Sequence, residues 1–250
     1  MTRISGSVCL VTGATGGIGG AVVELLRRRG AEVIASGRDR HRLDALAAVG
    51  VTAIAADLAA PGGAEALAAR AIEPGGRVDV LVNCAGAGWA GEFEGMEPAE
   101  IDALVTLNLT AILELTRALL PGMLERGHGH VVNVASIAGH AGVASEAVYS
   151  AAKAGLIAFA DSLRLETWGR GLLVSTVSPG AVATSFFARR GRPYDRPFPP
   201  PVTAGRVAEA VVSAIEHDRA QVFVPRWLGL AARVKGAAPG VYRTLARRFG

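Results

Sequence analysis

The chain has 250 residues, half of them apolar, which is enough to bury the core of one large α/β domain or of two small ones. Its net charge of +4 belongs to the C-terminal end, because residues 219–250 hold seven of the 26 Lys and Arg residues and no acidic residue. The other 19 basic residues are set against 22 acidic ones, and no face of interleaved basic and aromatic residues is recognisable, which argues against a nucleic-acid partner.

Short apolar runs alternate along the chain with longer amphipathic stretches. Seven runs are predicted as strands: Val8–Thr12, Glu32–Ala35, Thr52–Ala55, Val78–Val82, Gly129–Ala135, Leu172–Val177 and Gln221–Val224. Five stretches are predicted as helices: Gly19–Arg29, Arg38–Ala48, Gly63–Ala71, Pro98–Glu125 and Ala147–Trp168. Strands alternating with helices are typical of crossover units. The sequence therefore predicts an α/β fold: a doubly wound sheet of about seven parallel strands with helices on both faces, forming a single domain over residues 1–225.

Two segments depart from this alternation. Residues 189–201 are rich in Arg and Pro and cannot sustain a helix or a strand ladder. They follow the strand end at Pro179-Gly180, where ligands of open α/β sheets bind, so the segment at about 185–204 is predicted to be a lid, with a plain loop as the alternative. Residues 226–250 form a basic amphipathic tail. We expect this tail to dock on the body or on a neighbouring subunit rather than on an anionic membrane.

The first strand leads into a glycine-rich turn, Thr12–Gly19. Gly13, Gly17 and Gly19 fit the pattern G-x-x-x-G-x-G, while Gly13, Gly16 and Gly19 also fit G-x-x-G-x-x-G. In both patterns the backbone can approach a pyrophosphate at a helix N-terminus, where unpaired N–H groups favour an anion. The turn therefore predicts a dinucleotide site.

The end of the second strand indicates which dinucleotide. Gly37 stands where an acidic residue would bind the ribose 2′-hydroxyl of NAD, and Arg38, followed by Arg40 and Arg42, could bind the 2′-phosphate of NADP. Asp39 lies one or two positions late for a ribose contact, and it keeps NAD(H) as the alternative. The prediction is NADP(H).

Tyr149 and Lys153 lie four residues apart in a predicted helix and so share one face. A phenol has a pKa of about 10, too high for easy proton exchange near neutrality, and an ammonium group one turn away would lower it. A Tyr-x-x-x-Lys pair alone is usually an ordinary helix face, but Ser136 at a strand end and the upstream glycine turn favour a proton donor for a carbonyl oxygen. His140, close to Ser136, is predicted to be a supporting or exposed residue.

With these motifs the chain resembles the short-chain dehydrogenase/reductase family, in its short branch with the Tyr-x-x-x-Lys motif. The resemblance spans residues 5–225 approximately. Six elements agree in order: Thr12–Gly19, Asp57-Leu58, Asn83-Cys84-Ala85-Gly86, Asn108, the set Ser136, Tyr149 and Lys153, and Pro179-Gly180 with Thr184. It implies a Rossmann-like fold and an NAD(P)-dependent oxidoreductase.

The resemblance also implies residue roles. Ser136 would hold the substrate oxygen, Lys153 would also bind the nicotinamide ribose, and Asn108 would hold a water that links the lysine to solvent. The implied catalytic set is Asn108, Ser136, Tyr149 and Lys153. The implied cofactor-binding set is Gly13, Thr15, Gly17, Ile18, Gly19, Arg38, Asp57, Leu58, Asn83, Ala85, Gly86, Tyr149, Lys153, Pro179, Gly180 and Thr184. No metal is expected.

The substrate pocket is predicted to be apolar. Aromatic residues cluster in the lid segment, and apolar residues flank the catalytic pair: Phe186, Phe187, Tyr194 and Phe198, with Ile137, Val143 and Val148. Such a pocket favours a bulky or acyl-chain ketone, aldehyde or secondary alcohol. As the alternative, Arg189, Arg190 and Arg192 would hold an acidic carrier.

The predicted function is therefore hydride transfer between NADP(H) and a carbonyl or secondary alcohol, by a carbonyl reductase or the reverse dehydrogenase. A catalytically silent NADP-binding module is the alternative, and the complete Ser136, Tyr149 and Lys153 set argues against it. The helical stretches 98–125 and 147–168 are expected to form a homodimer or homotetramer interface.

The predicted location is the cytoplasm. Cys9 and Cys84 lie in apolar strand-like runs, which predicts buried reduced thiols. The N-terminus lacks the pattern of a signal peptide, and no uninterrupted apolar run approaches the roughly 20 residues of a membrane span.

Overall fold

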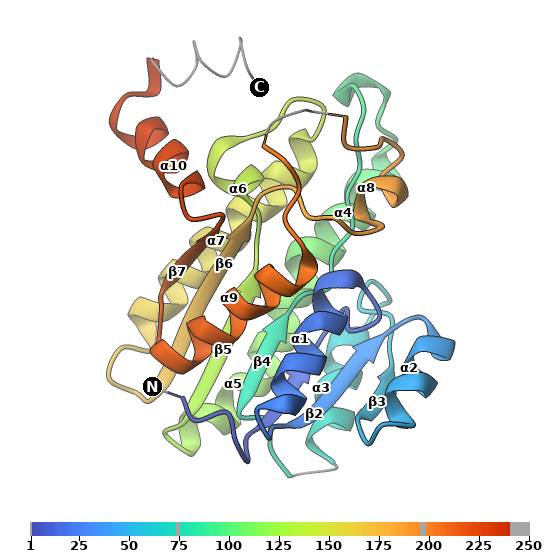
Figure 1. Ribbon diagram of the computed structural model, residues 1–250, viewed down its shortest axis with the longest axis vertical. Helices are drawn as coiled ribbons and strands as arrows, with labels where there is room; N and C mark the ends of the chain where they lie inside the picture. Colours follow the sequence, from blue (N-terminus) through green and yellow to red (C-terminus); the bar gives the residue numbers. More distant parts are fainter. Residues whose placement is uncertain (1, 74–75, 196–198, 241–250) are drawn as a thin grey trace.

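One parallel sheet organises the chain, seen in a computed structural model that describes residues 2–73, 76–195 and 199–240. Its strands are β1 (Val8–Val11), β2 (Glu32–Gly37), β3 (Thr52–Ala55), β4 (Val80–Asn83), β5 (Gly129–Val134), β6 (Leu172–Pro179) and β7 (Gln221–Val224). Their order is β3-β2-β1-β4-β5-β6-β7 (Figure 1). The chain winds outward in both directions from β1 and β4, which confirms the predicted doubly wound, Rossmann-like α/β fold.

Helices cover both faces of this sheet (Figure 1). They are α1 (Gly17–Arg28), α2 (Arg40–Ala47), α3 (Gly63–Ile72), α4 (Pro98–Val105), α5 (Ala111–Glu125), α6 (Ile137–Ala141), α7 (Ala147–Glu166), α8 (Phe186–Arg189), α9 (Ala204–His217) and α10 (Leu228–Ala237), with a 3-10 turn η1 (Phe93–Gly95) and a π-helical turn η2 (Thr106–Thr110). Helices α1 and α9 pack on one face, and α3, α5 and α7 pack on the other.

Successive residues of a strand point to opposite faces, so a strand covered on both sides must be apolar throughout. In β1, Cys9 and Val11 belong to the core shared with α1 and α9, whereas Val8 and Leu10 belong to the core shared with α3 and α5. All four are buried. This continuous burial explains why the strands were recognisable from short apolar runs. The residues after each strand end then emerge together at one edge of the sheet.

The prediction of one continuous helix over Pro98–Glu125 is wrong in the middle of that range. A π-helical turn, Thr106–Thr110, separates α4 from α5 and contains the buried Asn108. By length and a mean hydropathy of 1.5 the whole run could cross a membrane. However, Ile112, Leu115 and Met123 of α5 are buried inside the protein, which accounts for the apolar composition.

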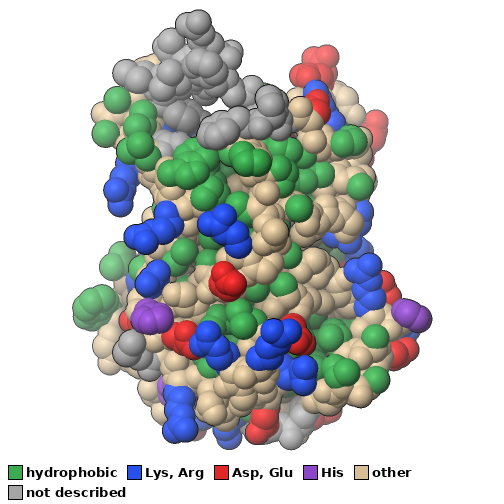
Figure 2. Space-filling model, in the orientation of Figure 1, with side chains coloured by type: hydrophobic (Ala, Val, Ile, Leu, Met, Phe, Trp, Pro, Cys, Tyr) green, Lys and Arg blue, Asp and Glu red, His purple; other side chains and the backbone are tan. Residues whose placement is uncertain are grey.

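The described part of the C-terminal tail docks on the body of the same chain. Helix α10 packs on α6 and β7, its Leu228 is buried, and Lys235 Nζ donates a hydrogen bond to the His140 carbonyl oxygen at 2.8 Å. Tail residues 241–250 and the lid residue Phe198 lie outside the described residues. On the face shown in Figure 2, basic and acidic side chains are interspersed over the lower half, and hydrophobic side chains gather in the upper half.

A buried histidine lies at the start of β5, toward the amino ends of the strands. Each ring nitrogen of His130 faces a hydroxyl: Nδ1 lies 3.1 Å from Thr2 Oγ1 and Nε2 lies 2.8 Å from Ser175 Oγ. Burial, helped by nearby positive charges, lowers the pKa of His130 to about 3. The folded protein therefore holds this ring neutral.

This histidine should make stability depend on pH. Between pH 6.5 and 3 the unfolded chain binds a proton that the folded chain does not, so the free energy of unfolding falls as the pH falls, by up to about 1.4 kcal/mol per pH unit. We expect urea unfolding to report a loss of about 2 kcal/mol for the wild type between pH 6.5 and 5 from this group. His130→Gln should be less stable at neutral pH but should lack this slope. The matched control is His41→Gln at the exposed start of α2, which should keep the slope; equal slopes in all three proteins would contradict the assignment.

Candidate active site

The glycine turn between β1 and α1 forms the floor of the first of two cavities. Gly13 has a φ of +65°, and a Cβ there would lie 2.8 Å from Ala85 Cα. A Cβ on Gly17 would lie 2.5 Å from Thr184 Cγ2. These glycines let the turn lie against the end of β4 and against the segment after β6. No described side chain caps α1 at Gly16, so the N–H groups of its first turn face the cavity, as a pyrophosphate site requires.

This first cavity has a volume of about 590 Å³ and collects most of the predicted cofactor residues. Its predicted members are Gly13, Thr15, Gly17, Ile18, Gly19, Arg38, Asp57, Leu58, Ala85, Gly86 and Thr184. Asn83 lines neither this cavity nor the second one described below. Its side-chain amide donates to Asn133 Oδ1 at 2.9 Å. Beside it, Thr12 Oγ1 accepts the N–H groups of Cys84 and Ala85, both at 3.1 Å, and thereby fixes the strand end. Sequence analysis missed this role of Thr12.

At the end of β2 the structure explains the missing acidic residue. A Cβ on Gly37 would lie 2.6 Å from Thr15 Oγ1 and 2.8 Å from Thr15 Cγ2, so a side chain at 37 collides with Thr15. Asp39 is engaged with its own helix, where it caps α2 by accepting the Arg42 N–H at 3.1 Å. Arg38 and Arg42 both line the cavity, and Arg42 Nη1 donates to the Thr15 carbonyl oxygen at 2.6 Å. The cavity is therefore cationic at this end.

The second cavity has a volume of about 420 Å³ and adjoins the first. Five residues line both: Ile18, Cys84, Gly86, Thr184 and Phe186. All four predicted catalytic residues line the second cavity, together with Pro179 and Gly180: Asn108, Ser136, Tyr149 and Lys153. The predicted proton donor thus lies where the two cavities meet.

Tyr149 and Lys153 share one face of α7 and are 7% and 3% exposed. Lys153 Nζ lies 5.8 Å from the centre of the Tyr149 ring and donates to the Val134 carbonyl oxygen at 3.2 Å. Burial raises the pKa of Tyr149 above that of a free phenol, against the lowering effect of a hydrogen bond with Ser136. Burial therefore decides the direction of this pKa shift, and the lowering predicted from the i, i+4 lysine is not observed. Burial also lowers the pKa of Lys153 to about 8.

Ser136 follows β5 and begins α6. Its Oγ accepts the Ala138 N–H at 3.1 Å, which fixes the hydroxyl as the N-cap of the helix. Helix α6 packs closely on α7, and a Cβ on Gly139 would lie 2.7 Å from the Lys153 backbone. The cap and this close packing bring a strand end and a helix face together around the phenol.

Asn108 points into the same place from the π-helical turn. Its amide donates to the Ala87 and Leu104 carbonyl oxygens at 3.0 and 2.9 Å, while its buried Oδ1 has no hydrogen-bond partner among the described residues. A Cβ on Gly86 would lie 2.8 Å from this Oδ1 and 3.5 Å from Lys153 Nζ. An acceptor and an ammonium group therefore flank one small space that glycine leaves open, which fits the water predicted to lie between them.

Aromatic side chains form one part of the wall of the second cavity. The Phe186 ring is tilted against the Tyr149 ring with centres 5.7 Å apart, the Phe187 ring lies 5.6 Å from that of Phe186, and the Tyr194 ring lies 5.0 Å from that of Phe187. Leu228 of α10 also lines the cavity. Sequence analysis missed Leu228, because the tail was separated from the site along the chain. Ile137 and Val143 line the cavity as predicted, whereas Val148 packs in the cluster behind Tyr149.

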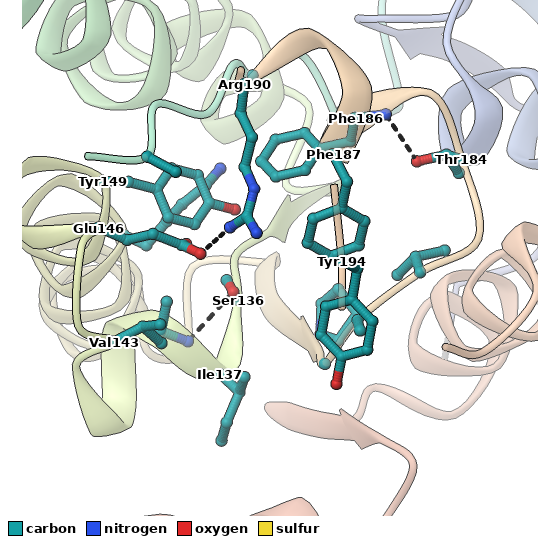
Figure 3. A pocket seen from close by; sticks show the side chains of 18 of the residues that line it. Ser136, Ile137, Val143, Glu146, Tyr149, Thr184, Phe186, Phe187, Arg190 and Tyr194 are labelled. Atoms are coloured by element: carbon teal, nitrogen blue, oxygen red, sulfur yellow. Dashed lines mark hydrogen bonds and ion pairs between the residues drawn. The ribbon is translucent and has the colours of Figure 1, made fainter. Parts of the chain in front are cut away.

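Two polar residues near this cavity are already engaged. Arg190 forms an ion pair with Glu146, with Tyr149, Glu146 and Ser136 on one side of the guanidinium and Phe187 and Tyr194 on the other (Figure 3). Of the three arginines predicted to hold an acidic carrier, Arg190 is therefore already paired within the protein, whereas Arg192 lines this cavity and Arg189 lines the first one. His140 Nε2 lies 3.0 Å from Ser178 Oγ, which agrees with a supporting role.

Comparisons with known proteins agree with this geometry. The family model described as short chain dehydrogenase matches residues 7–195. The ketoacyl reductase HetN of Nostoc sp. is 40% identical over 235 residues, which are 90% of this chain and 80% of the relative. The 3-oxoacyl-(acyl-carrier-protein) reductase FabG of Vibrio cholerae is 38% identical over 186 residues, 73% of this chain and 76% of the relative.

A solved structure gives the same result. The short-chain dehydrogenase from Sphingobium yanoikuyae in complex with NADPH superposes with a TM-score of 0.82 at 31% identity, covering 94% of this chain and 96% of that one. The glycine turn, the Ser136, Tyr149 and Lys153 set and these matches lead to one conclusion. The chain belongs to the short-chain dehydrogenase family and is an NAD(P)-dependent oxidoreductase.

Proposed function

We propose that the protein is an NADP(H)-dependent reductase of ketones on an acyl chain or another bulky apolar group. One observation carries the proposal: Tyr149 and Ser136 lie in the wall of a cavity that also presents aromatic and aliphatic side chains and that adjoins the glycine-turn cavity. Two relatives are named as ketoacyl or 3-oxoacyl reductases, which supports an acyl-chain substrate. The reverse reaction, oxidation of the secondary alcohol, uses the same groups.

The preference for NADP(H) is supported by the charge at the end of β2. Arg38 and Arg42 line the cavity there, and the collision between a side chain at Gly37 and Thr15 excludes the acid that would bind a free ribose. Arginine pairs well with phosphate because its planar donors match two oxygens. The structural relative solved with NADPH agrees with this assignment, and NAD(H) remains the weaker alternative.

The chemistry follows from where each group lies. When bound, the nicotinamide supplies the hydride for the carbonyl carbon. Tyr149 donates its hydroxyl proton to the carbonyl oxygen, and Ser136 holds that oxygen by a hydrogen bond that strengthens as negative charge develops. Lys153, whose pKa is lowered to about 8, can return a proton near neutral pH, and the water predicted beside Asn108 Oδ1 would lie next to it. The apolar rings exclude bulk water from these transfers.

A silent NADP-binding module is the less favoured candidate. Such a module has no need for a proton donor, a hydroxyl aligned with it and a buried lysine in one cavity.

We also propose a homodimer or homotetramer in the cytoplasm. In support, α7 leaves Leu165 and Trp168 at its end 75% and 81% exposed, large apolar side chains that an interface would cover.

The proposal predicts that Tyr149 is essential for turnover. NADPH absorbance with a panel of 3-oxoacyl thioesters and bulky ketones should detect reduction by the wild type. In Tyr149→Phe, kcat should fall by about 10²–10⁴-fold, the usual contribution of a positioned general acid. NADPH affinity, measured by calorimetry, is the control and should stay within about twofold, since the phenol is not needed to hold the phosphates. Wild-type turnover in Tyr149→Phe would remove the assigned acid.

The collision at Gly37 predicts a two-residue requirement for NADH preference. Gly37→Asp alone should lower kcat/KM for both cofactors, because the new side chain meets Thr15. Thr15→Ala/Gly37→Asp removes Oγ1 and Cγ2, and should shift the ratio of kcat/KM toward NADH by roughly tenfold or more. Thr15→Ala alone is the matched control and should keep the NADPH preference. A full shift in Gly37→Asp alone would show that Thr15 does not restrict this position.

From the position of Leu228 we predict that this side chain limits the length of acyl chain that the substrate cavity accepts. Leu228→Ala should enlarge the cavity and raise kcat/KM for longer acyl chains relative to short ones by roughly tenfold, within the 10–200-fold range that one methylene-sized contact commands. The matched control is Leu230→Ala, whose side chain on the same helix is exposed and should leave chain-length preference unchanged. Equal preference in both variants would place Leu228 outside the substrate path.

A further inference from the structure

One buried ion pair near the active site has no part in the mechanism above. Arg190, at the end of α8, pairs with Glu146, which precedes α7, and their side chains are only 8% and 13% exposed. Two further contacts hold the arginine: Nε donates to the Arg192 carbonyl oxygen at 3.0 Å, and the guanidinium carbon lies 4.6 Å from the centre of the Phe187 ring. A buried pair of this kind is costly to form, and breaking it costs more.

The pair joins the lid to the helix that carries the proton donor. Glu146 precedes Tyr149 by three residues and starts the same helix. On the lid side, Arg190 directly follows α8, whose Phe186 ring is tilted against the Tyr149 ring with centres 5.7 Å apart. The lid therefore meets the helix at two places, an aromatic contact on the phenol itself and an ion pair one turn away.

The loop after β4 completes this enclosure. A Cβ on Gly88 would lie 2.6 Å from Phe186 Cζ and 3.1 Å from Arg190 Cβ, so the loop lies directly under the lid. The Gly91 N–H donates to the Ser145 carbonyl oxygen at 3.0 Å and ties the same loop to the residue before Glu146. With the lid seated, Arg190 is enclosed between three segments (Figure 3).

We propose that Arg190 is a positioning residue that acts through Glu146: their ion pair seats the lid on Tyr149 and balances the carboxylate charge beside the phenol. The proposal rests on the proposed function, since it assigns Tyr149 as the proton donor. It concerns opening of the lid and charge at the phenol, and it adds no new reacting group.

The charges around the phenol support this role. Among the described residues, three charged groups face Tyr149: Glu146 just before α7, Lys153 from α7, and Arg190 from the lid. Glu146 raises the pKa of Tyr149 and Arg190 lowers it, so each offsets the other. If Arg190 lost its charge, the carboxylate would act on the phenol alone and would disfavour the phenolate.

Lid opening can be measured without assaying the reaction. Chymotrypsin would be used on the whole protein, with cleavage after Phe186, Phe187 and Tyr194 followed by mass spectrometry. Arg190→Met and Glu146→Gln should each be cleaved in the lid about tenfold faster or more, as expected when one partner of a buried pair is removed. The double variant should be cleaved no faster than the faster single variant. Arg28→Met, which removes an arginine from the exposed pair with Glu24, is the control.

A pH profile tests the charge at the phenol. In alcohol oxidation the phenolate is the base, so log kcat/KM rises with pH. Glu146→Gln should move this rising limb to lower pH and Arg190→Met should move it to higher pH, whereas a contact that only supports the fold would move neither.

The outcomes separate the two proposals. Wild-type cleavage rates in either single variant, or effects that multiply in the double variant, would overturn the ion pair as the group that seats the lid. An unmoved limb in both variants would overturn the positioning role. If the wild type reduced no carbonyl in the panel, the proposed function would fail, and the cleavage rates alone would still decide whether the pair seats the lid.

Discussion

Burial of an ammonium group beside a phenol is the constraint on which the site depends. Lys153 is almost fully buried, and its Nζ donates a hydrogen bond to the Val134 carbonyl oxygen at the end of β5. A charge in such a place is costly, and burial lowers its pKa to about 8. The same burial raises the pKa of Tyr149. The enclosed site therefore makes the Lys153 ammonium group easier to deprotonate. It also keeps the Tyr149 hydroxyl protonated until charge develops next to it.

The fold supplies that enclosure with few residues. Parallel strands β4, β5 and β6 end at one edge, and their following segments carry Gly86, Ser136 and Gly180 into one cavity. Close approach is possible because small residues stand where segments meet, as at Gly139 between α6 and α7 and at Gly86 below Asn108. The π-helical turn then aims Asn108 at the space beside the lysine, a use for which π turns are known at functional sites.

Sequence patterns predicted the parts that are encoded locally. The buried strands were recognisable as apolar runs, and the glycine turn, Ser136 and the Tyr149–Lys153 pair were recognisable by their spacing. Helix α9 was missed although Val207, Val211 and Ile215 follow a helical period, so that signal was available. The π-helical turn gave no comparable signal in the sequence, because one inserted residue leaves the apolar pattern of Pro98–Glu125 almost intact. The direction of the Tyr149 pKa shift was also hidden, since four-residue spacing reveals a neighbour but not the depth of burial.

The features that distinguish this chain arise from contacts between residues that lie far apart in the sequence. Arg190 and Glu146 are separated by 44 residues, and Leu228 reaches the cavity from α10, which follows the edge strand β7. Read as a sequence, the arginines of the lid suggested a site for an acidic carrier. In the fold, Arg190 is already paired with Glu146, while Arg192 lines the same cavity beside Asp195. That difference bears on which substrates the site favours: an anion that bound Arg190 would have to displace Glu146, whereas an acyl chain could lie along the rings of Phe186 and Phe187 and on Leu228.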